Sequence, residues 1–168
     1  MHRLSSYFLT SLLLLVSLEL AAQEWSRFRG ENGTGIGKIG ALPDSFTKAD
    51  YDWAIKLNGV GHSSPVLWGD KLFLTVVDEG KQQRVVTCYD SGNGKRLWKW
   101  SDDISEHNLH NHNNFASSTP AASADAVFVV WGSGKKTEAL CLTHDGELIW
   151  RKEWDNFFSD HGFGCSPI

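Results

Sequence analysis

The sequence predicts an all-β protein built from repeated small sheets, and three observations support this. One short opening recurs three times, each time with a hydroxyl side chain before proline: Ser64-Pro65, Thr119-Pro120 and Ser166-Pro167. Turns and short runs of β-branched or aromatic residues follow the first two openings, which is typical of strands. No segment beyond the N-terminal apolar run shows the 3.6-residue apolar period of an amphipathic helix, so we expect little helix.

Each repeat contains enough strand-like segments for a four-stranded sheet. The segments expected to be strands are Lys71–Val77 and Arg84–Tyr89 in the first copy, and Ala126–Trp131 and Glu138–Thr143 in the second. A glycine-containing turn then leads to Leu97-Trp98 in the first copy and to Ile149-Trp150 in the second. About four short strands in roughly 50 residues is the pattern of a β-propeller blade.

The repeat divides the chain into a leader, a lead-in and blades. We expect a signal peptide over 1–22, a lead-in over 23–52, blades over 53–103 and 104–155, and the start of a third blade over 156–168. Two blades and the start of another would leave uncovered sheet faces, because blades bury their faces against neighbours. The sequence therefore predicts an incomplete propeller from a longer protein of roughly six to eight blades.

The N-terminus has the pattern of an export signal. Arg3 precedes the apolar run Tyr7–Leu18, and the small residues Ala21 and Ala22 follow as a cleavage site. The apolar run is shorter than the roughly 20 residues that a membrane helix needs. We expect a periplasmic or extracellular protein with no stable membrane span after cleavage.

Composition excludes one class of partner. The chain has 16 basic and 20 acidic residues, which gives a formal net charge of −4, and its basic residues form no run or stripe. A nucleic-acid surface is therefore not expected. The three cysteines, Cys88, Cys141 and Cys165, form no CxxC pair, so we interpret them mainly as small buried residues in strands.

The glycine–tryptophan segments resemble a known family of repeats. Cys88 to Trp98 is similar to the tryptophan-docking motif of pyrroloquinoline-quinone-like (PQQ-like) repeats, which it matches at Asp90, Gly94 and Trp98. The second copy keeps Gly146 and Trp150 and is expected to carry Leu142 where the motif has aspartate. The opening Trp25 to Gly33 also resembles the start of bacterial propellers of this family. The resemblance implies that each docking tryptophan lies against the neighbouring blade.

One segment has the residue types of a metal site. Glu106, His107, His110 and His112 could together ligate a transition metal. Their spacing matches no established ligand pattern, so we favour a polar connection between blades and expect no metal.

Other chemical patterns are weaker. Gly35 to Gly40 has the spacing of a dinucleotide-binding loop without the flanking strand and helix. We interpret His62 and His161 as isolated loop or blade-edge residues, and Asp102-Asp103 as a solvated turn. No catalytic residue is assigned.

The family resemblance leaves several functions open. The favoured one is a non-catalytic propeller that binds protein or peptide on its rim and requires no cofactor, similar to the propeller subunit of the outer-membrane assembly machinery. The alternative is the N-terminal part of a quinoprotein dehydrogenase that uses PQQ and Ca²⁺. A carbohydrate-binding module is a third, weaker option. Repeat geometry already accounts for most of the tryptophans that such a module would use.

Overall fold

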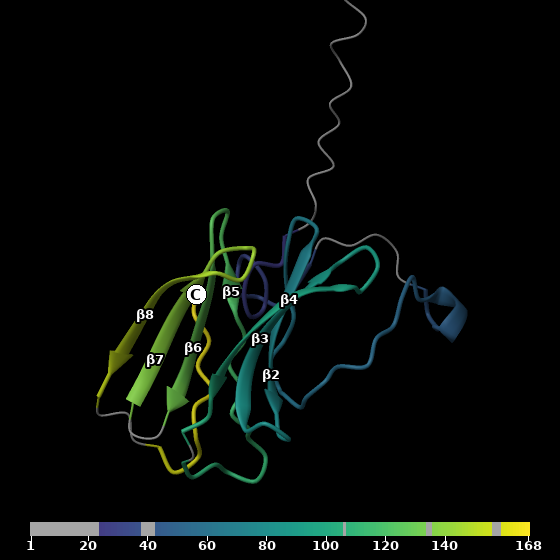
Figure 1. Cartoon of the computed structure of the whole chain (residues 1–168). Helices are drawn as coiled ribbons and strands as arrows, with labels where there is room; N and C mark the ends of the chain where they lie inside the picture. The colour runs from purple at the N-terminus through teal and green to yellow at the C-terminus, as the bar shows by residue number, and fades with distance from the viewer. Residues whose placement is uncertain (1–23, 38–42, 106, 134–135, 156–158) are drawn as a thin grey trace, which may run out of the picture.

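The computed structural model describes residues 24–37, 43–105, 107–133, 136–155 and 159–168. These residues form two four-stranded antiparallel sheets and one 3-10 turn, Lys48–Asp50 (Figure 1). The predicted all-β class is confirmed. Within these ranges no helix has the length and apolar character needed to cross a membrane. The predicted signal peptide, 1–22, lies outside the described residues.

The strands of each sheet follow one another in sequence order, as in a propeller blade. The first sheet contains β1 (Val66–Trp68), β2 (Lys71–Asp78), β3 (Gln83–Asp90) and β4 (Arg96–Asp103). The second contains β5 (Ala121–Ala122), β6 (Val127–Ser133), β7 (Lys136–Leu142) and β8 (Leu148–Trp154). Each strand pairs with the next along the chain, so both sheets are simple meanders.

Burial explains why the middle strands have continuous apolar runs. Strands β2 and β3 are buried along nearly their whole length, because both of their faces are covered. The outer strands β4 and β8 are mostly exposed, and β4 alternates between exposed and partly buried residues. The blades therefore have an apolar centre and a solvated outer strand.

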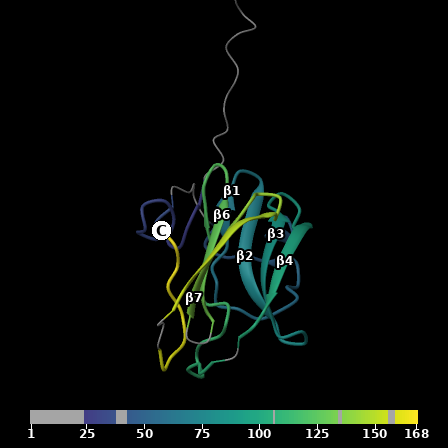
Figure 2. The ribbon, with the colours of Figure 1, turned by 60° about the vertical axis from the view of Figure 1, so that its left-hand side comes forward.

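The second sheet packs against one face of the first (Figures 1 and 2). At one end of this interface, Phe73 and Cys88 of the first sheet contact Ala122 and Val127 of the second. Further along, Val86 packs against a cluster from the second sheet that consists of Val129, Trp131, Leu140 and Leu142. This interface is the main core of the described structure.

The three repeated openings lie in a row and are linked by hydrogen bonds. The Ser64 amide donates to Thr119 Oγ1 at 3.0 Å, and the Thr119 amide donates to Ser166 Oγ at 3.0 Å. The hydroxyl side chains before the second and third repeated prolines thus accept the amide of the preceding copy. This function explains why serine or threonine recurs at that position.

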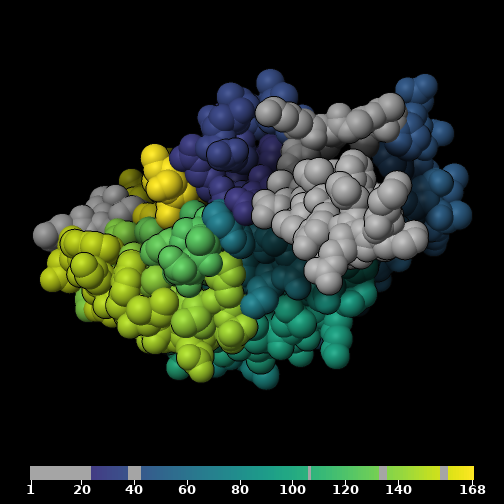
Figure 3. Space-filling model, turned by 90° about the horizontal axis from the view of Figure 1, so that it is seen from above, coloured from purple at the N-terminus to yellow at the C-terminus, as the bar shows by residue number. Residues whose placement is uncertain are grey.

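The N-terminal segment joins the innermost strands of both sheets. Trp25 pairs with Leu67 of β1 through backbone hydrogen bonds of 3.0 and 2.9 Å, and the Ser26 carbonyl accepts the Ala122 amide of β5 at 2.7 Å. Seen from above, the purple N-terminal segment lies beside the yellow C-terminal segment, residues 159–168 (Figure 3). Trp25 and Ser26 of the lead-in therefore form backbone hydrogen bonds with the innermost strands of both sheets.

The strand register corrects one assignment in the second docking motif. Cys88 lies opposite Trp98 and Cys141 opposite Trp150, and each sheet has a bulge directly after that cysteine. Thr143, and not Leu142, is therefore the counterpart of Asp90, because the second turn is one residue shorter. The Thr143 hydroxyl accepts the amides of the turn, as the Asp90 carboxylate does in the first sheet.

The cysteines differ sharply in their surroundings, which gives a direct test of the fold. Burial raises the pKa of the Cys88 thiol to about 12 and also raises the pKa of Cys141, whereas Cys165 is exposed. We expect Cys165 to react quickly with Ellman's reagent in native protein, and the other two thiols to react only after denaturation, because thiolates are the reactive form. Rapid native labelling of all three thiols would contradict the packing.

Candidate functional site: the interface between the two sheets

Trp98 joins the first sheet to the second by lying on a glycine turn. Its indole Nε1 donates to the His144 carbonyl at 2.8 Å, and its ring covers Gly146. Gly146 has a φ of +88°, and a Cβ there would come within 2.7 Å of the indole. Glycine is thus required both by the backbone and by the close approach of the ring.

Trp53 makes the same contact with the first sheet, and sequence reasoning missed its role. Its Nε1 donates to the Ser91 carbonyl at 2.8 Å, and its ring lies on Gly94, where a Cβ would be 2.5 Å away. The sequence pattern that could have revealed this docking role is the alternation of Trp53, Ile55 and Leu57, which resembles an outer strand. The segment before β1, beyond the predicted lead-in 23–52, therefore supplies a docking tryptophan of its own.

The remaining predicted docking residues have different positions. Asp90 shapes the turn that carries Gly94, with its Oδ1 accepting the amides of Gly92 and Asn93 at 2.8 and 3.2 Å. Trp150 packs against Phe128 of its own sheet, with ring centroids 6.2 Å apart. Within the described ranges no glycine turn covers Trp150, so its docking across a blade boundary stays a prediction.

The docking contact of Trp98 predicts that replacing Trp98 and replacing Trp150 by alanine will affect the stability of the fold unequally. Trp98→Ala should lower the free energy of unfolding by about 3 kcal/mol, because it removes a large side chain packed between the sheets. Trp150→Ala should lower the free energy of unfolding by clearly less than Trp98→Ala. Urea unfolding followed by far-UV circular dichroism measures both, and equal losses would contradict the proposed difference.

A buried ion pair lies at the centre of the same interface. Arg84 of β3 and Glu138 of β7 are 1% and 3% exposed, and Arg84 Nη2 lies 2.7 Å from Glu138 Oε2. Arg84 Nη1 donates to the Gly132 carbonyl at 2.9 Å, and the guanidinium lies 4.3 Å from the ring centre of Trp131. The Trp131 indole in turn donates to Glu138 Oε2 at 3.0 Å.

Arg151 of β8 extends this pair into a network between the sheets. Arg151 lies 2.7 Å from Glu138 Oε1 and 2.8 Å from Asp102 Oδ2 of β4. The interpretation of Asp102-Asp103 as a solvated turn is therefore wrong for Asp102, which is a partly buried cross-sheet partner. Beside the network, Trp100 stacks on Trp131 with ring centroids 6.1 Å apart.

These contacts determine what the network can do chemically. Burial alone would raise the pKa of Glu138, but hydrogen bonds from Arg151 and Arg84 and their positive charges together lower it below the ordinary 4.5. Burial lowers the pKa of Arg84, although an arginine remains protonated in proteins. Glu138 is thus an ionised carboxylate held by two cations, which makes it a structural anion and a poor proton acceptor.

The lowered pKa of Glu138 predicts a pH-dependent contribution to stability. Glu138→Gln should destabilise the protein by about 3 kcal/mol at pH 7, because it leaves Arg84 buried without a full counter-charge. A depressed carboxyl pKa stabilises the fold above the unfolded value and loses this effect as pH falls through the folded value.

The difference between the wild type and Glu138→Gln should therefore shrink as the pH falls below 4.5. Urea unfolding at several pH values tests this. Asp145→Asn is the matched control, since this exposed carboxylate pairs with Lys71 at the surface, where ion pairs contribute about 0–1 kcal/mol. A constant difference for Glu138→Gln across the pH range would contradict the argument.

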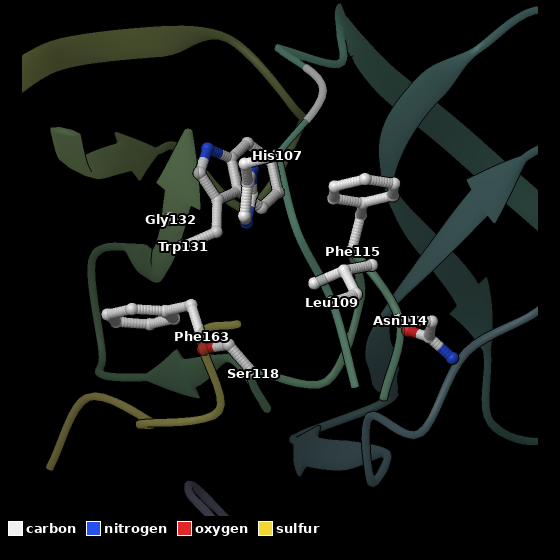
Figure 4. A pocket seen from close by; sticks show the side chains of 8 residues that line it. All are labelled: His107, Leu109, Asn114, Phe115, Ser118, Trp131, Gly132 and Phe163. Carbon is white, nitrogen blue, oxygen red and sulfur yellow. The ribbon is translucent and has the colours of Figure 1, made fainter. Parts of the chain in front are cut away.

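A small aromatic pocket adjoins Trp131. It is lined by Trp131 and Gly132 of β6, by Ser118, and by His107, Leu109, Asn114, Phe115 and Phe163 from the connecting segments (Figure 4). Its space of about 10 Å³ has room for about one water molecule. His107 belongs to its wall, with its ring edge-on to Phe115 at 5.0 Å and its Nδ1 3.0 Å from the Ser105 carbonyl.

The residues considered for a metal site have different surroundings where the structure describes them. His107 packs in the pocket wall, and Glu106 lies outside the described residues. The rings of His110 and His112 are 5.3 Å apart, and His161 lies 5.4 Å from His110. His161 is therefore not isolated, as its carbonyl also accepts the Asn113 amide side chain at 2.7 Å. In the described part of the chain, no three His, Cys, Asp or Glu side chains could hold a metal ion.

Comparisons with known proteins include two remote likenesses among solved structures. No known family profile and no curated protein sequence matches the chain. Among solved structures, a europium-containing methanol dehydrogenase is 18% identical with a TM-score of 0.40, covering 54% of this chain and 15% of its own. BamB from Moraxella catarrhalis is 16% identical with a TM-score of 0.45, covering 60% of this chain and 27% of its own. This chain thus spans a small part of either protein, and at these values neither likeness decides its function.

Proposed function

We propose that this chain is part of a non-catalytic, PQQ-like β-propeller scaffold that binds protein or peptide at the outer edges of its blades. The supporting observation is the outer strand β8, a sheet edge with which no other strand of the described residues pairs. It carries three large exposed apolar side chains: Leu148 at 47%, Ile149 at 52% and Trp154 at 51%. Unpaired strand edges with apolar side chains suit a partner that adds a strand.

The charge network supports a scaffold role. The buried carboxylate and guanidinium groups of the interface bind one another across the two sheets. Asp102 and Glu138 are held by arginines, so neither is available as a general base or as part of an open cation site. These groups stabilise the pairing of blades.

The alternative needs a PQQ and Ca²⁺ site, and many alcohol-oxidising members of that family also place two adjacent cysteines against the quinone. Cys88 and Cys141 lie in different sheets, and Cys165 is distant in sequence, so no adjacent cysteine pair is present. The buried carboxylates of the interface are already paired with arginines. No reaction step is therefore assigned to this chain.

The compartment is part of the same proposal and rests on the sequence of 1–22. An export signal would place the blades in the periplasm or outside the cell, where a scaffold of the cell envelope would act. Cys88 and Cys141 are buried thiols, which would protect them in an oxidising compartment.

Site-specific photocrosslinking in the native host tests the function. A photoreactive phenylalanine analogue at Trp154 on β8 should form a discrete adduct with a protein, whereas the same analogue at the exposed turn residue Glu79 should not. Adducts at both positions or at neither would remove the support for edge binding. Saturable binding of PQQ with Ca²⁺, together with dye-linked alcohol oxidation, would overturn the non-catalytic assignment.

A further inference from the structure

A buried hydroxyl group lies in the wall of the aromatic pocket beside Trp131. Ser118 is 3% exposed, and its Oγ is fully buried. Among the described residues this oxygen has no hydrogen-bond partner. A serine hydroxyl has one donor proton and two acceptor lone pairs, and buried polar groups of native proteins are nearly always hydrogen-bonded. The surroundings of Ser118 therefore have to supply a partner.

The equivalent serine of the first copy shows what this position requires. Ser63 and Ser118 both lie two residues before a repeated proline. Ser63 Oγ accepts the Thr75 amide at 3.2 Å and donates to the Ser64 carbonyl at 3.2 Å. Neither kind of contact forms at Ser118 Oγ within the described ranges. The same hydroxyl is thus satisfied by the protein in the first copy and not by the described residues in the second.

Hydrogen bonds between the copies hold Ser118 where it is. Its carbonyl accepts the Thr75 hydroxyl of β2 at 2.9 Å. The next residue, Thr119, accepts the Ser64 amide and donates its own amide to Ser166. Moving the backbone at Ser118 would break these bonds, so the hydroxyl cannot reach a different partner in that way.

The pocket beside Ser118 has the size of one water molecule. Its space of about 10 Å³ is close to the smallest that can hold a water, and it is too small for an organic molecule or a hydrated ion. Figure 4 shows Ser118 and the Phe163 ring on one side of the pocket, with Trp131 and His107 across from them. The size of the pocket therefore selects water as its ligand.

The wall also offers a second polar partner. A buried water makes about three hydrogen bonds, with a range of two to four. Gly132 lines the pocket with backbone atoms alone, because glycine has no side chain. Its carbonyl accepts Arg84 Nη1 at 2.9 Å and keeps a second lone pair. The side chains of His107 and Asn114 make the rest of the wall partly polar.

We propose that this pocket binds one structural water molecule, held by Ser118 Oγ and the backbone of Gly132. The water gives Ser118 the partner that Ser63 finds in the Thr75 amide, and it links the second opening to the end of β6. The site lies where β6, the connection 107–118 and the third opening meet. It therefore depends on contacts already made within the described structure and on no uncovered sheet face.

A high-resolution crystal structure of the full-length exported protein tests the proposal. We expect a density peak in the pocket at about 2.5–3.0 Å from Ser118 Oγ, the usual range for hydrogen bonds between oxygens. The peak should be lost in Ser118→Ala. Ser63→Ala is the matched control, because it removes the equivalent hydroxyl from a position where the partner is an amide of the protein. The pocket of that variant should keep its water.

Oxygen-17 relaxation dispersion makes the same comparison in solution, since it counts the water molecules that a protein holds for longer than those at its surface. Ser118→Ala should hold one such water fewer than the wild type, and Ser63→Ala should hold the same number.

The wild-type map alone can overturn the proposal, even if Ser118→Ala fails to fold. A dry pocket in a map that shows other buried waters would overturn it, as would a rotamer that brings Ser118 Oγ to a protein acceptor. A peak that persists in Ser118→Ala would show that other groups hold the water, and equal counts in solution for all three proteins would also contradict the site.

Discussion

The buried contact between Arg84 and Glu138 constrains the rest of the described structure. Charges removed from water are tolerated only where they are paired and hydrogen-bonded, so both sheets must meet in one register. Trp131 contacts both members of the pair, and Arg151 links Glu138 to Asp102 of the outer strand. A slip of either sheet by one residue would leave an ionised side chain buried without its partner.

The interface combines repeated and unique contacts. A tryptophan docks on the glycine turn of a following sheet at Trp53 with Gly94 and at Trp98 with Gly146, and these contacts set the distance between successive elements. Trp25 lies on Gly30 in the same way, within the lead-in itself. The ion pair occurs once in the described structure, since the places of Arg84 and Glu138 are taken by Thr137 and Val85 in the other sheet. The tryptophan–glycine contacts can thus recur in any blade. The single Arg84–Glu138 pair, by contrast, determines which faces of these two sheets pack together.

The ionisable groups inside the interface differ from those outside it, which is consistent with the proposed scaffold function. The ionisable groups inside the interface neutralise one another, which stabilises it without leaving a free acid or base. Outside this interface, β8 carries the exposed apolar side chains Leu148, Ile149 and Trp154. Recognition of another polypeptide requires such exposed edges and charges, and requires no reactive centre.

The sequence by itself determined the repeat, the strands and the glycine–tryptophan turns, because these are local patterns of alternation and turn chemistry. It misplaced the counterpart of Asp90, since a turn shorter by one residue is visible only once Cys141 is seen opposite Trp150. Tertiary structure alone decided that Trp53 docks, that Asp102 is paired and that Arg84 meets Glu138. Those contacts join residues dozens of positions apart, and their partners are fixed by how two sheets pack, which no local pattern encodes.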